Sequence, residues 1–196
     1  MNPIELPTIY NITVSGRIGT GTTTLAKGLA DTLGWTLLEG GVLFADIHQR
    51  LKLSELEVSG RPDRFDTDYE EKIKRLLLQK KYQVIQSHLA GFDAQGMKGI
   101  FKILVLCEDE LGGDKTEIRI DRLVNRRRIP IREAKQEVQM REEENLAKWR
   151  RLYAGGDTNW IYWDKKYYDL VVNTFTHNPD QTLEIALTAL GYKNNV

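Results

Sequence analysis

The sequence predicts an α/β fold in which a parallel β-sheet carries helices on both faces. Three observations support this prediction: short apolar segments alternate with longer amphipathic ones, a glycine-rich turn joins the first strand to the first helix, and no internal repeat is visible. Strands that alternate with helices form parallel sheets, because each crossover helix returns the chain to the same edge of the sheet. We expect one domain across the 196 residues, since chains of this length ordinarily bury a single core.

The first strand is expected over residues 9–15, where apolar and β-branched residues predominate. A glycine-rich turn over residues 16–21 separates it from a helix over residues 23–33. That helix is expected because its leucines recur at every fourth position and share one face, and the glycine at position 34 ends it.

The later elements follow from the same two patterns. Short apolar runs between turn residues predict strands at residues 35–38, 82–86, 100–107 and 169–173. Apolar residues at helical spacing predict helices at residues 42–53, 68–80, 116–127, 131–153 and 179–190. The segment 54–67 contains glycine and proline and is expected to be a loop, and the glycine-containing segment 91–99 connects two strands.

Composition and charge exclude several classes of protein. The chain has 28 Lys and Arg residues against 28 Asp and Glu residues, so its formal net charge is zero. This disfavours a nucleic-acid-coating role, because affinity for a polyanion depends on surplus positive charge. The single cysteine, Cys107, cannot form an intramolecular disulfide, and no apolar run approaches the ~20 residues of a membrane span. With no recognisable secretion signal, we expect a cytoplasmic monomer without a nucleic-acid or membrane partner.

The turn after the first strand reads Gly16-Arg17-Ile18-Gly19-Thr20-Gly21-Thr22-Thr23. Its spacing fits the phosphate-binding loop, although Thr22 stands where that pattern has lysine. Converging backbone N–H groups and the start of a helix attract phosphate oxygens there, and Thr23 is in register with the hydroxyl that ligates Mg²⁺. A tight turn without a ligand is the alternative. A dinucleotide-binding loop is rejected, because Thr24 occupies the position of its last glycine.

Arginines are concentrated in one short segment of this neutral chain. They are Arg119, Arg122, Arg126, Arg127, Arg128 and Arg132. Guanidinium groups bind phosphate oxygens bidentately, and phosphoryl transfer needs such charge near the migrating group. The apolar stripe of the helix expected over 131–153 is interrupted by Arg141, Glu142 and Asn145, which predicts that this face crosses a polar cavity. A solvated helix surface is the alternative for both segments.

Three further residues are candidates for contact with a substrate. His88 follows the strand expected over 82–86, at the edge where parallel sheets bind ligands, and a structural histidine is the alternative. Arg61 and Arg64 lie in the expected loop and could hold a phosphate of the acceptor, while solvent exposure is the alternative. The histidines and the cysteine show no metal-ligand spacing.

These motifs resemble the P-loop nucleoside monophosphate kinases, and most closely the archaeal-type cytidylate kinases. Residues 12–24 are similar to the family's first strand and phosphate loop, in which some members also carry Thr in place of the lysine. Residues 84–91 resemble its strand that ends in a Gly-Arg-Leu-Ala-Gly turn, and residues 168–174 resemble its last strand. The arginine-rich segment, continued by Arg141-Glu142, resembles its lid.

The resemblance implies a three-layer P-loop NTPase-type sheet with helices on both faces, an acceptor-binding insertion at about 40–80 and a lid at about 116–155. It implies phosphoryl transfer to a nucleoside monophosphate, CMP or dCMP, with ATP and Mg²⁺ as cofactors. Donor binding is expected from Gly16, Gly19, Thr20, Gly21, Thr22, Thr23, Thr24 and Arg122, with Thr23 also in the Mg²⁺ shell. Catalytic contacts are expected from Arg126, Arg141 and Thr22, and acceptor contacts from Arg61, Arg64, His88 and Gly91.

The chain departs from this family at two acceptor positions. Ala45 stands where the family has an arginine that grips the acceptor phosphate, and His88 replaces a second arginine. Two alternatives stay open. Ala45 favours a small-molecule P-loop kinase whose acceptor is not a nucleoside monophosphate. Thr22 favours a nucleotide-binding module that has lost catalysis, although the arginine-rich lid argues against it.

Overall fold

The computed structural model describes residues 2–51, 58 and 60–193, and within these ranges five parallel strands form one sheet in the order β2-β3-β1-β4-β5. The strands are β1 (Asn11–Gly16), β2 (Thr36–Glu39), β3 (Gln83–Gln86), β4 (Ile100–Leu106) and β5 (Leu170–Asn173). β1 lies at the centre, pairs with both β3 and β4, and is buried along its whole length. Strands buried on both faces are typical of parallel sheets covered by helices.

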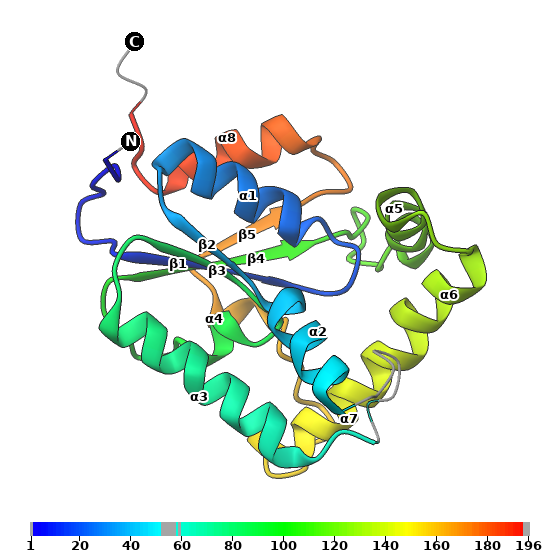
Figure 1. Cartoon of the computed structure of the whole chain (residues 1–196). Helices are drawn as coiled ribbons and strands as arrows, with labels where there is room; N and C mark the ends of the chain where they lie inside the picture. Colours follow the sequence, from blue (N-terminus) through cyan, green and yellow to red (C-terminus); the bar gives the residue numbers. More distant parts are fainter. Residues whose placement is uncertain (1, 52–57, 59, 194–196) are drawn as a thin grey trace.

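Helices cover both faces of this sheet, as the sequence predicts (Figure 1). They are α1 (Thr22–Leu33), α2 (Gly40–Leu51), α3 (Asp63–Gln79), α4 (Ala90–Asp93), α5 (Thr116–Arg127), α6 (Ile131–Lys135), α7 (Glu142–Tyr153) and α8 (Pro179–Ala189). α1 and α8 pack on one face through an apolar cluster that includes Leu29, Val105 and Ala186. α3 and α4 pack on the other face through a cluster that includes Ile73 and Ile85. The α/β fold class is therefore confirmed.

Three expected segments differ from the structure, one of them the connection over residues 91–99, which begins within the short helix α4. α3 begins at Asp63 rather than at residue 68, because Pro62 precedes it and Asp63 and Asp66 lie in its first turn, where acidic groups favour the positive end of the helix dipole. Residues 54–57 and 59 of the expected loop lie outside the described residues. The helix expected over 131–153 is continuous but contains a π-helical turn over Gln136–Arg141, which widens the helix between α6 and α7.

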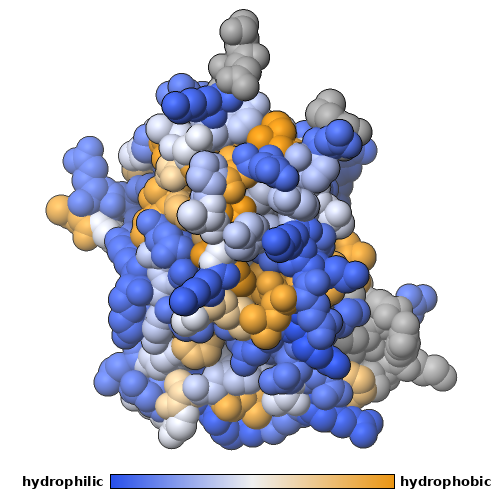
Figure 2. Space-filling view, turned by 90° about the vertical axis from the view of Figure 1, so that its left-hand side faces the viewer, coloured by the Kyte–Doolittle hydropathy of each residue, from blue (hydrophilic) through white to orange (hydrophobic). Residues whose placement is uncertain are grey.

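One face of the molecule shows the mixture of residues that is usual for a protein surface. On the face shown in Figure 2, hydrophilic residues predominate and hydrophobic residues appear in small separate groups. Scattered apolar side chains of this kind are normal on a folded protein. In the part of the chain that the structure describes, no helix is both long and apolar enough to cross a bilayer.

Gly91, for which the resemblance implies a contact with the acceptor, lies at a close packing contact in the structure. A Cβ atom at Gly91 would lie 2.2 Å from Cε1 of Tyr168, and the Gly91 amide donates a hydrogen bond to Ser15 Oγ at 3.0 Å. The space of its missing side chain is therefore filled by the tyrosine ring.

We expect Gly91→Ala to lower the free energy of unfolding by about 1–3 kcal/mol, because the added methyl group overlaps the Tyr168 ring. Gly41→Ala is the matched control in a helix, since no atom lies within 4 Å of its Cβ position. The control should be neutral or stabilising by up to about 1 kcal/mol. Urea unfolding of the three proteins measures both effects, and a Gly91→Ala protein as stable as the wild type would contradict the packing argument.

Candidate functional site

The turn between β1 and α1 has the geometry of an anion-binding loop. Gly19 and Gly21 have positive φ angles of 80° and 102°, and Gly21 is the residue that precedes α1. Only glycine fits at position 19, because a Cβ atom there would lie 2.5 Å from the carbonyl oxygen of Arg119. The turn thus leads directly into the N-terminus of α1, where the helix dipole favours a negative charge.

Two of the expected loop residues shape the turn from within. The Thr20 hydroxyl is buried and donates to the carbonyl oxygen of Arg17 at 2.8 Å. A Cβ atom at Gly16 would lie 2.5 Å from the Val105 carbonyl oxygen, so this position has no room for a side chain. Both residues support the loop conformation.

A buried carboxylate ties this loop to the helices on its far side. Glu142, at the start of α7, accepts hydrogen bonds from Arg17, from Arg119 and, at 3.2 Å, from the backbone amide of Ile18. Arg119 of α5 is fully buried, and it also donates to the Ile18 carbonyl oxygen at 2.7 Å and pairs with Asp114 at 2.8 Å. The pKa of Arg17 is raised: burial works to lower it, but the charges of Glu142 and Asp114 outweigh that effect.

The clasp, which we define as Arg17, Arg119 and Glu142, was not assigned from the sequence. Arg119 was one of six clustered arginines, and Glu142 was one of three residues that interrupt an apolar stripe. The contacts between them span 23 and 125 positions of the chain, so no local spacing identifies the pairs.

Two cavities meet at the loop. The first, of about 340 Å³, is called the central cavity; Thr22, Thr23, His88, Arg126 and Arg141 line it, together with residues of α2 and α3. The second, of about 490 Å³, is called the outer cavity and is lined by Thr24, Arg122, Arg126, Thr174 and the start of α8. Gly19 and Gly21 line both cavities, so a ligand on the loop would be reached from either side.

Arg126 and Arg127 of α5 and Arg141 of the π-helical turn line the central cavity. Of the three residues that interrupt the apolar stripe, only Arg141 lines it, because Glu142 and Asn145 bind Arg119 and Arg61 instead. Arg126 donates to Thr23 Oγ1 at 3.2 Å. Arg141 pairs with Glu137 at 3.1 Å, and Arg127 pairs with the same carboxylate. Arg122 faces the outer cavity and donates to both the hydroxyl and the carbonyl oxygen of Thr174 at 2.7 Å, which joins α5 to the end of β5.

His88 is oriented by the phosphate loop itself. Its Nδ1 lies 2.9 Å from the carbonyl oxygen of Gly16, and because a carbonyl only accepts, Nδ1 carries the proton. The ring packs 5.7 Å from Trp149 and 5.6 Å from Tyr162, measured between ring centroids. Burial, aided by the positive charge of Arg141, lowers the pKa of His88 to about 4. The imidazole is therefore neutral at pH 7 and adds no charge to the cavity.

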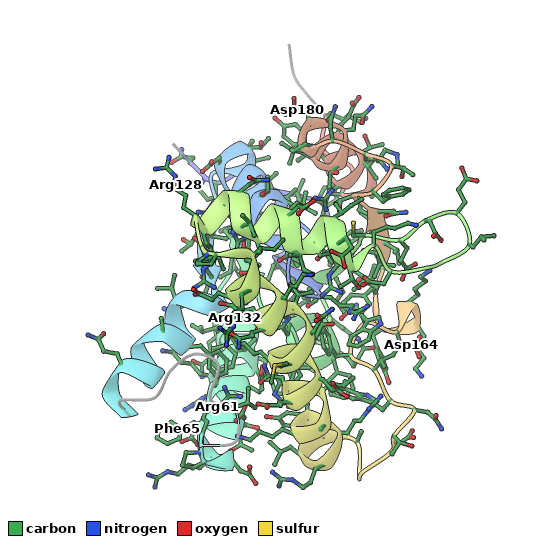
Figure 3. All side chains as sticks on the ribbon, turned by 90° about the vertical axis from the view of Figure 1, so that its right-hand side faces the viewer. Arg61, Phe65, Arg128, Arg132, Asp164 and Asp180 are labelled. Atoms are coloured by element: carbon green, nitrogen blue, oxygen red, sulfur yellow. The ribbon has the colours of Figure 1, made fainter. Side chains whose placement is uncertain are left out.

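Arg61 and Arg64 do not line the central cavity, although the Arg61 guanidinium lies 5.0 Å from the ring centroid of Phe44, which does. Arg61 is 3% exposed, pairs with Asp66 at 2.7 Å and donates to Asn145 at 3.0 Å, between α3 and α7 (Figure 3). Asp66 also accepts from Lys148 at 2.7 Å. Arg64 is exposed and lies over the ring of Phe65. The expectation that these two arginines grip an acceptor phosphate stays a prediction, and in this arrangement Arg61 holds α3 against α7.

The residues present fit a loop-bound phosphate with an accompanying Mg²⁺. Mg²⁺ is usually held by substrate phosphates and only one or two protein groups, and the Thr23 hydroxyl at the loop offers one such group. Among the described residues, no group of three or more His, Cys, Asp or Glu side chains could hold a metal ion. A metal in this site would therefore depend on the phosphates of its ligand.

The chain is similar in sequence to curated cytidylate kinases. That of Haloarcula marismortui is 30% identical over 182 residues, which cover 91% of this chain and 88% of that protein. That of Methanopyrus kandleri is 28% identical over 187 residues, which cover 91% of this chain and 92% of that protein. No protein-family model matches the chain.

Solved structures of small-molecule kinases share the fold. A shikimate kinase from Acinetobacter baumannii has a TM-score of 0.58 at 17% identity and covers 96% of this chain and 97% of its own. A gluconokinase from Sinorhizobium meliloti has a TM-score of 0.56 at 15% identity, and the match covers 93% of this chain and 91% of the gluconokinase. Similarity at these identities shows the fold alone.

We expect stability to fall between about pH 6.5 and pH 4, in part because of His88. Its pKa is about 4 in the folded protein against an ordinary value of 6.5, so in this window the unfolded chain binds a proton that the folded chain does not. The loss is at most about 3 kcal/mol.

His88→Gln should reduce this acid sensitivity, because its amide can still donate to Gly16 and does not titrate. Urea unfolding at pH 7 and pH 4.5 measures it, with His177→Gln as the matched control. Equal pH dependence in all three proteins would contradict the neutral, loop-bound state of His88.

Proposed function

The chain belongs to the cytidylate kinase family, and from this premise we propose that it transfers a phosphoryl group from Mg²⁺-bound ATP to CMP or dCMP. Membership makes it a nucleoside monophosphate kinase-like enzyme of the P-loop type. The observation that carries the proposal is the anion-binding loop at the start of α1, which opens into a cavity edged by Arg126 and Arg141.

In this proposal the donor phosphates bind on the loop, and the base and ribose of ATP occupy the outer cavity. Positive backbone dipoles at Gly19–Gly21 hold the phosphates, with Thr24 and Arg122 toward the nucleoside. Mg²⁺, when bound, would neutralise part of the phosphate charge, and Thr23 is the residue that would hold it. Arg126, which donates to the same hydroxyl at 3.2 Å, would then turn toward the phosphates.

The migrating phosphoryl group needs positive charge that the loop lysine ordinarily supplies. Thr22 stands at that position, is 8% exposed and accepts a hydrogen bond from Gln86 at 3.3 Å. We infer that Arg126 and Arg141 supply the charge instead, because both line the central cavity beside the loop. Catalysis then consists of positioning and electrostatic stabilisation.

The segments around the cavity divide between the two substrates. We propose residues of about 40–80, including α2 and α3, as the acceptor-binding insertion, and residues of about 116–155, from α5 to α7, as the lid. Closure of such a lid excludes water and completes the set of cationic contacts. The clasp residues Arg119 and Glu142 would form the fixed part against which the rest of the lid moves.

A second candidate is a kinase of the same fold with an uncharged acceptor. Among the described residues that line the central cavity from α2, α3 and the end of β3, none is a lysine or an arginine. Ala45 lies on this wall, and the nearby His88 is neutral. An acceptor without a phosphate would need no cation there.

A coupled assay over a panel of acceptors tests the proposal. Purified protein with ATP and Mg²⁺ is offered CMP, dCMP, UMP, AMP and a set of sugars, and ATP binding is measured in parallel by calorimetry. Turnover of CMP or dCMP is expected. Turnover of an unphosphorylated acceptor alone would favour the second candidate, and ATP binding without turnover of any acceptor would indicate a binding module.

We expect Thr23→Ala to weaken ATP binding roughly tenfold or more in the presence of Mg²⁺, and much less in its absence. The reason is that the hydroxyl acts on the nucleotide through the metal. Calorimetry with and without Mg²⁺ measures the two affinities, and Thr32→Ala, at the opposite end of α1, is the control. Equal losses under both conditions would remove Thr23 from the metal shell.

Arg141→Ala should lower kcat on the order of 10³-fold, since it removes a cation from the migrating phosphoryl group. Arg132→Ala, an exposed arginine on α6, should stay within a few-fold of the wild type. Steady-state kinetics and a thermal melt of each variant separate catalysis from folding. If turnover by Arg141→Ala also stays within a few-fold, Arg141 does not contact the reacting phosphate.

A further inference from the structure

A pair of buried acids lies outside the machinery described so far. Glu70 of α3 is 2% exposed, Asp93 of α4 is 7% exposed, and the two side chains interact. Glu70 Oε2 and Asp93 Oδ2 are both sealed from solvent without a hydrogen-bond donor. Lys74 pairs with the other oxygen of Asp93 at 3.3 Å. Two acid oxygens that lie together without any other hydrogen-bond donor repel each other unless they share one proton.

The proton belongs mainly to Glu70. Burial and then the neighbouring Asp93 raise the pKa of Glu70 well above its usual value. Burial also raises the pKa of Asp93, but the hydrogen bond from Glu70 and the charge of Lys74 work against that rise. Glu70 is therefore a neutral acid that donates its proton to the Asp93 carboxylate, which leaves its second oxygen as a hydrogen-bond acceptor only.

Glu70 lines the central cavity on the wall that faces away from the arginines. α3, which carries Glu70, and α5, which carries Arg126, lie on different sides of the molecule (Figure 1). Phe44 and Trp149 line the cavity near this wall, and the ring of Phe44 packs 4.3 Å from that of Tyr69, measured between centroids. An acceptor whose phosphate points toward the loop would place its base against this aromatic and acidic wall.

We propose that the Glu70 carboxyl is the group that determines base specificity in the acceptor site: it accepts a hydrogen bond from the exocyclic amino group of a pyrimidine, and so selects an aminopyrimidine nucleotide over a uracil nucleotide. This inference rests on the proposed function. Cytosine presents an amino donor at the position where uracil presents a carbonyl acceptor. Uracil would place its carbonyl oxygen against the Glu70 oxygen, so that two hydrogen-bond acceptors would face each other in a site without water. Sites that bind an N–H group reject analogues that lack this group.

The test compares ratios of kcat/KM for different acceptors within each protein, so that the fraction of folded enzyme cancels. The acceptors are CMP, UMP and the CMP analogue without the 4-amino group. The proteins are the wild type, Glu70→Leu, Glu70→Gln and Glu71→Gln, the last being an exposed neighbour on the same helix. The side chain introduced by Glu70→Gln can donate its amide N–H to Asp93 and still present a carbonyl oxygen to the base, so this variant serves as the conservative rescue.

The wild type should prefer CMP over both UMP and the analogue by about tenfold or more. Glu70→Leu should bring these ratios close to one, mainly through a higher KM for CMP, while Glu70→Gln and Glu71→Gln should keep them. A Glu70→Leu protein with wild-type ratios would overturn the inference. Should that variant not fold, equal use of CMP and the analogue by the wild type would overturn it as well.

Failure of the proposed function gives a different result. In that case the wild type itself turns over no nucleoside monophosphate, and the inference falls with its premise. If the inference alone is wrong, the wild type phosphorylates CMP, and the ratios do not respond to removal of the Glu70 carboxyl or of the amino group.

Discussion

The arrangement of the site depends on one buried carboxylate, that of Glu142. It binds both guanidinium groups of the clasp and the Ile18 amide, and so joins the phosphate loop to α5 and α7. Arg119 is fully buried, and an unpaired charge in such a place costs several kcal/mol. The pairing is therefore obligatory for the fold. The ion pair of Glu142 with Arg119 also lies next to the phosphate loop. The interaction that compensates the buried charge of Arg119 therefore also fixes the loop conformation.

The π-helical turn explains how one helix serves both the loop and the cavity. It spans Gln136–Arg141 and ends immediately before Glu142. A π-turn contains more residues than an α-helical turn and is costly, so it persists mainly where function or packing requires it. Here it lets Glu137 and Arg141 face the central cavity while the next residue, Glu142, reaches the loop.

Charge is distributed unevenly around the central cavity of this nucleoside monophosphate kinase-like enzyme. Arg126, Arg127 and Arg141 line it beside the loop, with Glu137 paired to two of them, whereas Glu70 and neutral or aromatic groups line the opposite wall. The first wall suits phosphates, which need charge and geometric precision more than they need a protein base. The second wall suits a nucleobase, which is recognised by hydrogen bonds and stacking. The chain as a whole is neutral, so its positive charge is a local property of one wall.

The order of strands and helices, the glycine loop and the arginine-rich helix were all predictable from the sequence. Each rests on local physics: apolar periodicity sets strands and helices, and Gly19 and Gly21 supply backbone angles that other residues rarely adopt. The resemblance to cytidylate kinases was likewise carried by short local motifs, and the relatives confirm it.

The roles of single polar side chains were decided only by the tertiary structure. The sequence places Arg61 in a loop, but the structure buries its side chain and hydrogen-bonds it to Asn145, which lies 84 positions away. His88 became neutral through burial beside Arg141, and Glu70 became an acid pair with Asp93 once α3 packed against α4. Burial and charge partners act through space rather than along the chain, and they set whether a polar group is charged, paired or available to a ligand.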